Sequence, residues 1–416
     1  MKKPFLSLAF SLFIVFALVP QAALAADYIE TVPPQYGWVG DFHEGLAWVQ
    51  AGDYPNEKYG FIDKTGKEVV PLKYNRVGDF HEGLAWVEKE KKYGFIDKTG
   101  KEVIPPKYNS AESFAGGLAM VYLEKRDGGS TYGFIDTTGK VVVPFGKYDL
   151  ADSFSNGMAS VTSTRKGGYI DKTGKELVQL GKYANRWPFS EGLAMVNLTN
   201  GNGNFAYINK TGKAITPFKY IFGGPFSDGM AAVQNGSRKY GFINKTGKEV
   251  VPPKYDWVEN FSEGMAVVSY GGMTPDSKWG FVDKTGKEII RPGKNVYVNQ
   301  YFSEGLAGVG VGGQFVWTGG RYSYLGGKWG YIDKAGREVI PKQYDWASEF
   351  SEGMAVVEVN GKRGLIDKTG REVVPPIYDL IGEVHDGMAY VGFGSVGPGY
   401  TYGFISVPDA TPYIHY

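Results

Sequence analysis

The chain repeats one pattern of apolar and polar positions along most of its length. In one copy an apolar run, Tyr93 to Ile96, is followed by Asp-Lys-Thr-Gly and then by a second apolar pair, Val103 and Ile104. Two short apolar runs on either side of a polar turn that ends in glycine predict two antiparallel strands joined by a tight turn. We therefore expect a β-hairpin in each copy.

A further strand is expected ahead of each hairpin, in the recurring segment Phe-x-Glu-Gly-Leu/Met-Ala-x-Val and its variants. This segment occurs ten times, and repetition at a near-constant spacing is typical of solenoids, propellers and other modular arrays. Alternation along a strand places its Ala and Val on one face, where a small residue favours close packing of neighbouring backbones. The copies are marked by Gly45, Gly83, Gly117, Gly157, Gly192, Gly229, Gly264, Gly305, Gly353 and Gly387.

Each unit is thus predicted to be a three-stranded meander, followed by a Pro-x-Lys-Tyr bend at which proline ends the pairing. The mature chain begins with the tail half of a unit, Val32 to Tyr36, and ends on the middle of one, Tyr402 to Ile405, an offset that would allow the ends to join. Propellers typically have about four to eight blades of four strands, whereas this chain has ten units with three predicted strands each. The prediction is an all-β, open, curved solenoid (superhelix), with a closed propeller-like ring as the alternative.

Nearly all variation in unit length falls in one connection, between the Ala-x-Val strand and the hairpin. It holds five residues at 88–92 and nineteen at 310–328. Equivalent loops of an array project from the same side, so the long ones should gather at one rim, where binding residues can vary. The longest carries Phe315, Trp317, Tyr322 and Tyr324, for which we predict an exposed contact surface in preference to a lid over the neighbouring unit.

The variable position of Ala-x-Val supplies two more candidates for ligand binding, Trp48 and Trp86. Because the same position is Ser160, Ala232 or Gly308 in other copies, it is not expected to lie deep in the core. An exposed ring there would suit a sugar ring or an aromatic partner. Packing of the ring against the adjacent unit is the other interpretation, and the favoured one.

The first 25 residues are predicted to be a secretory signal peptide. Lys2 and Lys3 precede an apolar stretch from Pro4 to Pro20, and the small-residue sequence Ala-Leu-Ala ends at Ala25. We expect cleavage after Ala25, which leaves residues 26–416 as the repeat array of a secreted or envelope-associated protein. An uncleaved anchor is the alternative. No later stretch is apolar enough to predict membrane insertion of the mature chain.

Composition and charge exclude several kinds of partner and site. With 45 Lys and Arg against 44 Asp and Glu, the formal net charge of +1 gives no overall attraction to nucleic acid or to an anionic membrane. The absence of cysteine excludes disulfides, thiolate metal sites and a cysteine nucleophile. Gly-x-Gly-x-x-Gly matches at Gly308 and Gly392 have no helical pattern after them, so no phosphate-binding site or cofactor is predicted.

Two rows of polar residues and a pair of histidines are the remaining candidates for chemistry. The Asp of Asp-Lys-Thr-Gly becomes Asn209, Asn244 and Ser406 in three copies; these share its ability to cap a turn but not its charge, so turn capping is favoured over metal binding. His43 and His81 occupy a slot that is serine in most other copies, and are interpreted as exposed variants rather than catalytic bases. An acidic residue precedes the repeat glycine in eight units. We interpret these residues as solvated turn residues rather than as a row of charges that attracts a cationic partner. They are Glu44, Glu82, Glu191, Asp228, Glu263, Glu304, Glu352 and Asp386. No catalytic or metal-binding residue is predicted.

Two segments carry a resemblance to a known family. Lys-Trp-Gly-Phe-Val-Asp-Lys-Thr-Gly-Lys-Glu-Ile-Ile, at 278–290, and Lys-Trp-Gly-Tyr-Ile-Asp-Lys-Ala-Gly-Arg-Glu-Val-Ile, at 328–340, resemble the WG (KWG) repeats of bacterial WG-repeat proteins. The resemblance extends from about Tyr36 to Ile405, with departures such as Ala206 in place of the glycine. It implies an exported or envelope-associated β-repeat protein, and it brings no catalytic residues.

We therefore predict a non-enzymatic, exported module that binds or scaffolds a partner at the cell envelope. Its expected ligand is a cell-wall glycan or a partner protein. One alternative is a glycan-binding module with a defined ligand, and another is a hydrolase whose site lies in the long rim loops. The oligomeric state does not follow from the sequence.

Overall fold

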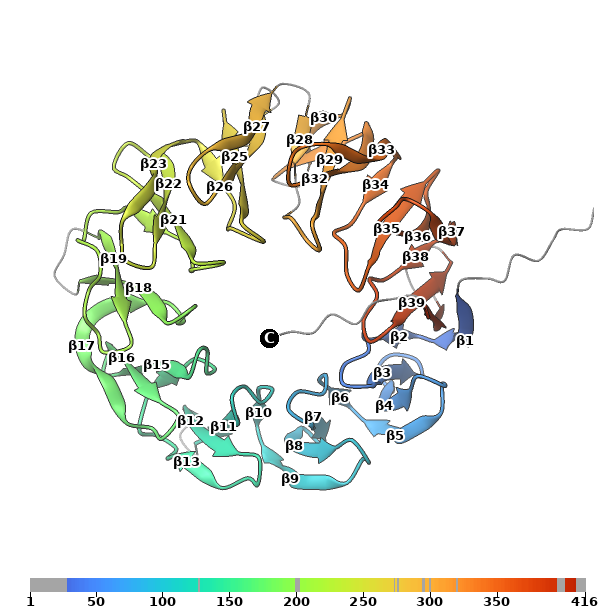
Figure 1. Ribbon diagram of the computed structural model, residues 1–416. Coiled ribbons are helices and arrows are strands. Elements are labelled where there is room, and N and C mark those ends of the chain that lie inside the picture. Colours follow the sequence, from blue (N-terminus) through green and yellow to red (C-terminus); the bar gives the residue numbers. More distant parts are fainter. Residues whose placement is uncertain are drawn as a thin grey trace, which may run out of the picture.

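A computed structural model describes residues 28–408, apart from 126–127, 199–202, 273, 275–276, 294–295, 299–300, 319–320 and 395–400; for 185, 296, 314–318 and 321–325 it describes the backbone alone. The predicted leader, residues 1–25, lies outside these ranges. Within them the regular structure is all β-strand, and no helix has the length and apolarity that crossing a bilayer requires. The strands form a ring of sheets around a central opening (Figure 1).

Units are numbered 1 to 10 by their repeat glycines, and the first three each form a four-stranded antiparallel sheet. Their strands, in spatial order, are β2 (Trp38–Val39), β3 (Leu46–Ala51), β4 (Lys58–Asp63) and β5 (Glu68–Tyr74); β6 (Arg76–Val77), β7 (Leu84–Lys89), β8 (Lys92–Asp97) and β9 (Glu102–Tyr108); and β10 (Ser110–Ala111), β11 (Leu118–Glu124), β12 (Ser130–Asp136) and β13 (Val141–Val143).

Units 4 and 5 share one six-stranded sheet because a long strand, β17, belongs to both. Its strands are β14 (Leu150–Ala151), β15 (Met158–Ser163), β16 (Lys166–Asp171), β17 (Glu176–Arg186), β18 (Leu193–Leu198) and β19 (Phe205–Asn209). Units 6 and 7 consist of β20 (Phe222–Gly223), β21 (Met230–Gln234), β22 (Tyr240–Asn244) and β23 (Glu249–Tyr255), and of β24 (Trp257–Val258), β25 (Met265–Tyr270), β26 (Lys278–Asp283) and β27 (Glu288–Gly293).

Unit 8 contains a separate two-stranded hairpin within its long connection. Its sheet is β28 (Val296–Val298), β29 (Leu306–Val311), β32 (Lys328–Asp333) and β33 (Glu338–Tyr344), and the hairpin is β30 (Gln314–Thr318) with β31 (Arg321–Leu325). Unit 9 is β34 (Trp346–Ala347), β35 (Met354–Val359), β36 (Lys362–Asp367) and β37 (Glu372–Tyr378). Unit 10 is β38 (Leu380–Ile381), β39 (Met388–Phe393) and β40 (Thr401–Ser406), completed by β1 (Ile29–Tyr36) from the N-terminal end.

The prediction of three-stranded meanders is wrong, because a further strand precedes the Ala-x-Val strand and pairs with it: a strand of two or three residues in nine units, and the long β17 in unit 5. In unit 2 this strand is β6, which pairs Arg76 with Glu88 and Val77 with Val87. It lies in the segment for which we predicted only a bend. A strand of two residues is too short to show the alternation by which strands are recognised in a sequence.

The prediction that proline ends the third strand is also wrong. In unit 2 the pairing of β8 with β9 shifts from Phe95 with Ile104 to Tyr93 with Tyr108, so the strand continues past its two prolines through a bulge. β9 is the last strand of its sheet, where proline's missing N–H group is tolerated. The bulge brings its backbone so close to β8 that a Cβ atom on Gly94 would lie 2.4 Å from the Ile104 carbonyl oxygen, which accounts for the recurring glycine at this position.

The open solenoid is wrong as well, because the array closes into a propeller-like ring. β1 pairs with β40 in antiparallel register, with Ile29 opposite Ser406 and Val32 opposite Phe404, and supplies the fourth strand of the last sheet. Figure 1 shows β1 beside the sheet of unit 10, next to β2 and β3. The closed ring, considered as the alternative, is the observed architecture.

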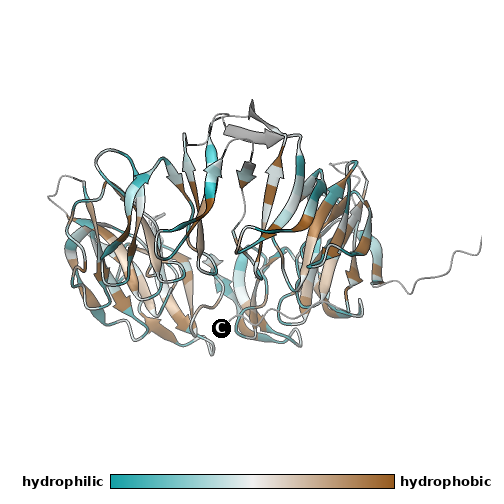
Figure 2. Cartoon of the chain, turned by 45° about the horizontal axis from the view of Figure 1, so that its top comes forward, coloured by the Kyte–Doolittle hydropathy of each residue, from teal (hydrophilic) through white to brown (hydrophobic). Residues whose placement is uncertain are grey.

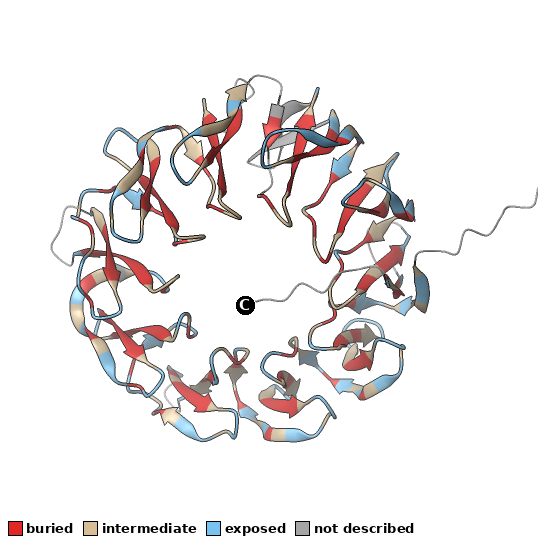
Figure 3. Cartoon of the chain, viewed as in Figure 1, coloured by how far each residue is buried: buried red, intermediate tan, exposed pale blue. Residues whose placement is uncertain are grey.

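Packing between consecutive sheets explains why the ring closes. Residues on one face of a sheet pack against the preceding unit and residues on the other face against the following one, so each core cluster spans a junction. Figures 2 and 3 show hydrophobic and buried residues along the strands of the sheets around the ring. At the junction of units 1 and 2, the rings of Phe61 and Phe80 meet edge to face at 4.8 Å between centroids. At the seam between units 10 and 1, Phe404 and Phe42 make the same contact at 4.9 Å. The seam is thus packed like the other junctions.

Antiparallel connectivity sorts the loops between the two ends of the sheets. The turns between the first and second strands lie toward the central opening (Figure 1), and the Asp-Lys-Thr-Gly turns are at the same end of their strands. The variable connections, between the second and third strands, are all at the opposite end. This arrangement agrees with the expectation that the long loops share one rim.

Candidate functional site

The turns that face the central opening share one geometry. In unit 1, His43 and Leu46 exchange two backbone hydrogen bonds, of 2.9 and 3.2 Å, across Glu44 and Gly45. Both central residues have positive φ angles, 53° and 88°, as a type I′ turn requires. A turn of this type holds the side chain of its first central residue away from its own strands.

The acidic residues of these turns join neighbouring units. The Glu82 carboxylate accepts hydrogen bonds from the backbone N–H groups of Gly116 and Gly117, at 2.6 and 2.7 Å. All eight acidic turn residues accept at least one such bond from the next turn around the ring. Lys98 adds an ion pair of 2.9 Å to Glu44. The interpretation of these residues as merely solvated is therefore wrong, since their carboxylates hold the ring of turns together.

The serine that precedes them has a similar role. In six consecutive units its hydroxyl donates to a backbone carbonyl of the next unit, at distances of 2.6 to 3.0 Å. These serines are Ser155, Ser190, Ser227, Ser262, Ser303 and Ser351. The recurring polar side chains of the inner rim are thus occupied in joining units.

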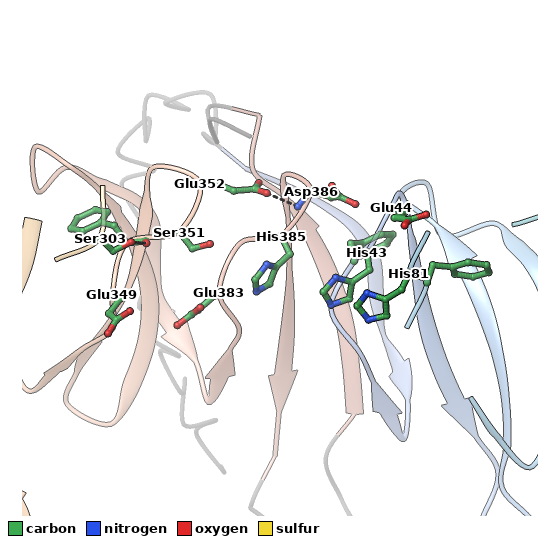
Figure 4. Close-up of a pocket in the computed structure, with 13 residues that line it drawn as sticks. His43, Glu44, His81, Ser303, Glu349, Ser351, Glu352, Glu383, His385 and Asp386 are labelled. Carbon is green, nitrogen blue, oxygen red and sulfur yellow. Dashed lines mark hydrogen bonds between the residues drawn. The ribbon is translucent and has the colours of Figure 1, made fainter. Parts of the chain in front are cut away.

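Four units differ from this pattern: unit 3 has Ala115 in the slot, and the other three, which ring closure makes neighbours, have histidine. Units 10, 1 and 2 carry His385, His43 and His81 in the serine slot. The three imidazole rings lie side by side, with 5.9 Å between the centroids of His43 and each of the other two (Figure 4). About a third of the His43 and His385 side-chain surface is exposed. The prediction identified the slot of His43 and His81 but missed His385 and the row that the three form.

Carboxylates of adjacent units accompany the histidines. The Nε2 atom of His43 lies 4.0 Å from the Asp79 carboxylate, and that of His385 lies 4.0 Å from Asp41. Burial raises the pKa of Asp41, an effect that the two nearby imidazoles oppose. Burial also raises the pKa of Glu349, with the charge of nearby Glu383 adding to the effect.

The three histidines, Glu349 and Glu383 border a cavity of about 880 Å³ at the inner rim. Its lining comes from units 8, 9, 10, 1 and 2, and includes the three histidines with Glu349, Glu383 and the turn carboxylates of units 1, 9 and 10 (Figure 4). We call His385, His43 and His81, together with Glu349, Glu383, Asp41 and Asp79, the seam arc. Across the described ranges, no group of three or more His, Asp or Glu side chains has an arrangement suited to a metal ion.

The two predicted tryptophans are half-buried. Trp48 lies against Gly40, so closely that a Cβ atom there would be 2.1 Å from its Nε1 atom, and its ring centroid is 5.8 Å from that of Tyr59. Trp86 lies against Gly78 in the same way. Both rings also contact the core clusters shared with the following unit. Their role in ligand binding stays a prediction.

The four aromatic residues of the long loop fall in the hairpin β30–β31. The register places Phe315 opposite Tyr324 and Trp317 opposite Tyr322. Their side chains lie outside the described part of the structure. The structure thus brings these four positions together in two cross-strand pairs, while the contact surface predicted for them stays a prediction.

The role predicted for the Asp-Lys-Thr-Gly aspartate is confirmed. Asp63 Oδ1 accepts hydrogen bonds from the Thr65 hydroxyl at 2.6 Å, the Thr65 N–H at 2.9 Å and the Lys67 N–H at 3.1 Å. Asn209 makes the same three contacts in unit 5. A carboxylate and an amide oxygen are interchangeable here because the turn needs an acceptor and no charge.

Comparison with solved structures finds matches at low similarity only. BamB from Moraxella catarrhalis is 14% identical, the match covering 55% of this chain and 78% of that one, with a TM-score of 0.32. Hsv2p from Kluyveromyces lactis is 8% identical over 60% and 96% of the two chains, with a TM-score of 0.33, and the WD40 propeller domain of Doa1 is 12% identical over 58% and 93%, with a TM-score of 0.26. Likenesses this weak carry no argument about function.

The family comparison is decisive. No curated protein matches the chain. The family described as WG containing repeat, however, matches it ten times, at residues 30–54, 59–93, 93–126, 132–163, 168–202, 205–238, 240–273, 279–315, 329–362 and 364–394. These matches span most of the ring, and their Trp/Tyr-Gly dipeptides include the glycines that the strand bulge requires. The chain belongs to the WG-repeat family.

Proposed function

We propose that the protein is a non-enzymatic binding module, exported to the cell envelope, which holds a partner protein at the inner rim of its ring. One observation carries this proposal. The recurring polar groups of the rim are occupied by bonds between units, whereas the seam arc departs from that pattern, and its three histidines, Glu349 and Glu383 border the cavity. A closed ring also supplies a rigid frame for such a surface.

Export rests on the sequence of residues 1–25 and on the character that the resemblance implies. Fractionation of cells that express the full chain, and of cells that express it without residues 1–25, tests this part. Only the full chain should reach the envelope or the medium, as a shorter, processed form. Equal distribution of the two would contradict export.

Retention of the purified ring, residues 26–416, on isolated cell envelopes tests binding. We expect the double variant Glu349→Gln/Glu383→Gln to lose retention, because it changes the charge of the cavity and little of its shape. The matched control is Glu68→Gln/Glu102→Gln, which removes two exposed charges at the starts of β5 and β9. Equal retention of both variants would remove the seam arc from the proposal.

The same preparation distinguishes the other functions that the sequence leaves open. Retention on purified peptidoglycan after proteolysis of the envelope fraction would favour a cell-wall glycan as the ligand over a protein. Turnover of a panel of hydrolase substrates would favour an enzyme.

A further inference from the structure

Two independent departures from the repeat coincide in the seam arc. The first is histidine in place of serine, in units 10, 1 and 2. The second is a carboxylate two positions before the serine or histidine slot, directly ahead of the core Phe or Val. It occurs in units 9, 10, 1 and 2, as Glu349, Glu383, Asp41 and Asp79. The other six units have Ser, Pro, Asn or Tyr there. Both departures occupy adjoining units that lie at opposite ends of the chain and meet only in the closed ring.

The charge of the cavity indicates the kind of partner. Its lining includes five carboxylates, from Glu44, Glu349, Glu352, Glu383 and Asp386, and no lysine or arginine. Two of them, Glu352 and Asp386, are held by backbone N–H groups of the next turn, and Glu44 is paired with Lys98. Glu349 accepts one bond from a backbone N–H group, and Glu383 has no hydrogen bond or ion pair within the described residues. Net negative charge therefore remains at neutral pH.

We propose that the seam arc binds a lysine- or arginine-rich segment of a protein partner at neutral pH, and releases it when the three histidines become protonated. This inference rests on the proposed function and names the chemistry of the partner. Cationic side chains complement the unneutralised carboxylates, and the cavity is large enough for several of them.

Protonation of the histidines would offset much of the negative charge of the cavity. Imidazole groups change charge between about pH 5 and pH 8, whereas most carboxylates stay ionised to lower pH. The groups that face the imidazoles are Asp41 and Glu44 from unit 1, Asp79 from unit 2, Glu349 and Glu352 from unit 9, and Glu383 and Asp386 from unit 10. A cation, Arg363, lines a neighbouring pocket together with Asp41, Glu383 and His385, and it is paired with Glu358 at 3.0 Å. Three added positive charges would compete directly with the bound lysines for these carboxylates.

The test uses residues 26–416 and a fluorescent peptide of alternating glycine and lysine, with a glycine–glutamate peptide as its counterpart. Anisotropy titrations at about pH 7.5 and about pH 5.5, in low salt, measure the two affinities. We expect the lysine peptide to bind at the higher pH and to lose about tenfold or more in affinity at the lower pH. The glutamate peptide should not bind at the higher pH.

The triple variant His43→Ser/His81→Ser/His385→Ser isolates the switch. Serine already occupies this slot in six units and bonds the next unit there, so the variant should fold, as circular dichroism and thermal melting would show. It should bind the lysine peptide with nearly the same affinity at both pH values. An unchanged pH dependence in this variant would overturn the switch, and equal binding of the glutamate peptide at the higher pH would overturn the cationic partner.

These outcomes separate the inference from the proposed function. Retention on envelopes that depends on Glu349 and Glu383, without preference for the lysine peptide, would overturn the partner's chemistry and leave the binding function standing. The expected peptide behaviour without such retention would overturn the envelope function alone.

Discussion

The carboxylate of Asp386 accepts a hydrogen bond of 2.7 Å from the backbone N–H of Gly45, a residue 341 positions earlier in the chain. It is the same contact that acidic turn residues make between units consecutive in sequence. The seam therefore reproduces at the inner rim the bond that joins the other turns. Within the sheet of unit 10, the N-terminal strand β1 closes the seam by pairing with β40.

Removal of residues 28–36 should open the ring. These residues include β1, whose pairing with β40 completes the sheet of unit 10 and joins the two ends of the chain. We expect a larger radius of gyration by small-angle X-ray scattering and a lower melting temperature. The single substitution Val32→Ala, at a side chain 1% exposed, should cost roughly 1–2 kcal/mol without opening the ring. Glu30→Ala, at an exposed position of the same strand, is the neutral control. Unchanged scattering after the deletion would contradict closure through β1.

Replacement of the glycine in the Trp/Tyr-Gly dipeptide by alanine should destabilise some units more than others. In Gly94→Ala the new Cβ atom would lie 2.4 Å from the Ile104 carbonyl oxygen, and the strain should cost roughly 1–3 kcal/mol. In Gly133→Ala the nearest atoms are 3.1 Å away, so the loss should be smaller. Comparison of denaturation midpoints for the two variants provides the measurement, and the reverse order would show that the bulge does not impose the glycine.

The stability that the Asp63 turn cap contributes should require a hydrogen-bond acceptor at this position, and it should depend on pH because the carboxyl group ionises. Asp63→Ala removes three hydrogen bonds and should cost about 1 kcal/mol, whereas Asp63→Asn should cost less, because Asn209 caps the equivalent turn. Hydrogen bonds from the Thr65 hydroxyl and from the backbone N–H groups of Lys67 and Thr65 hold the pKa of Asp63 below its ordinary value. The ionised cap therefore contributes stability above the ordinary aspartate pKa of about 3.9, and this is lost as pH falls through the lowered pKa. Urea denaturation at about pH 7 and about pH 3 should show a smaller difference for Asp63→Asn than for the unmodified chain.

The long connection of unit 8 should be removable without harm to the ring. Pairing of β29 with β32 ends at Val311 and Lys328, just as pairing of β7 with β8 ends at Lys89 and Lys92. Replacement of residues 312–327 by Asn-Gly, the turn found at Asn360 and Gly361, should leave the circular-dichroism spectrum and melting temperature unchanged. Retention on envelopes then tests the binding predicted for this loop. A large fall in melting temperature would indicate that the loop stabilises the fold.

The sequence by itself determined the hairpin within each unit and the number of units. Alternation and turn chemistry are local, so the hairpin around Asp97, the cap that this aspartate supplies and the ten copies follow from residues close together in the chain. The family resemblance rests on the same local pattern. The acceptor role of Asp63 and its equivalents could be inferred because asparagine replaces aspartate in two copies.

Only the tertiary structure decided the shape and the candidate site. Whether an array curls shut depends on the angle between neighbouring sheets, which is set by how side chains such as Phe61 and Phe80 interlock and accumulates over ten junctions. No local sequence pattern specifies the sum of these angles. For the same reason His385 and His43 become neighbours only when the seam closes. The seam arc is therefore a product of closure, because the residues that form it lie at opposite ends of the chain.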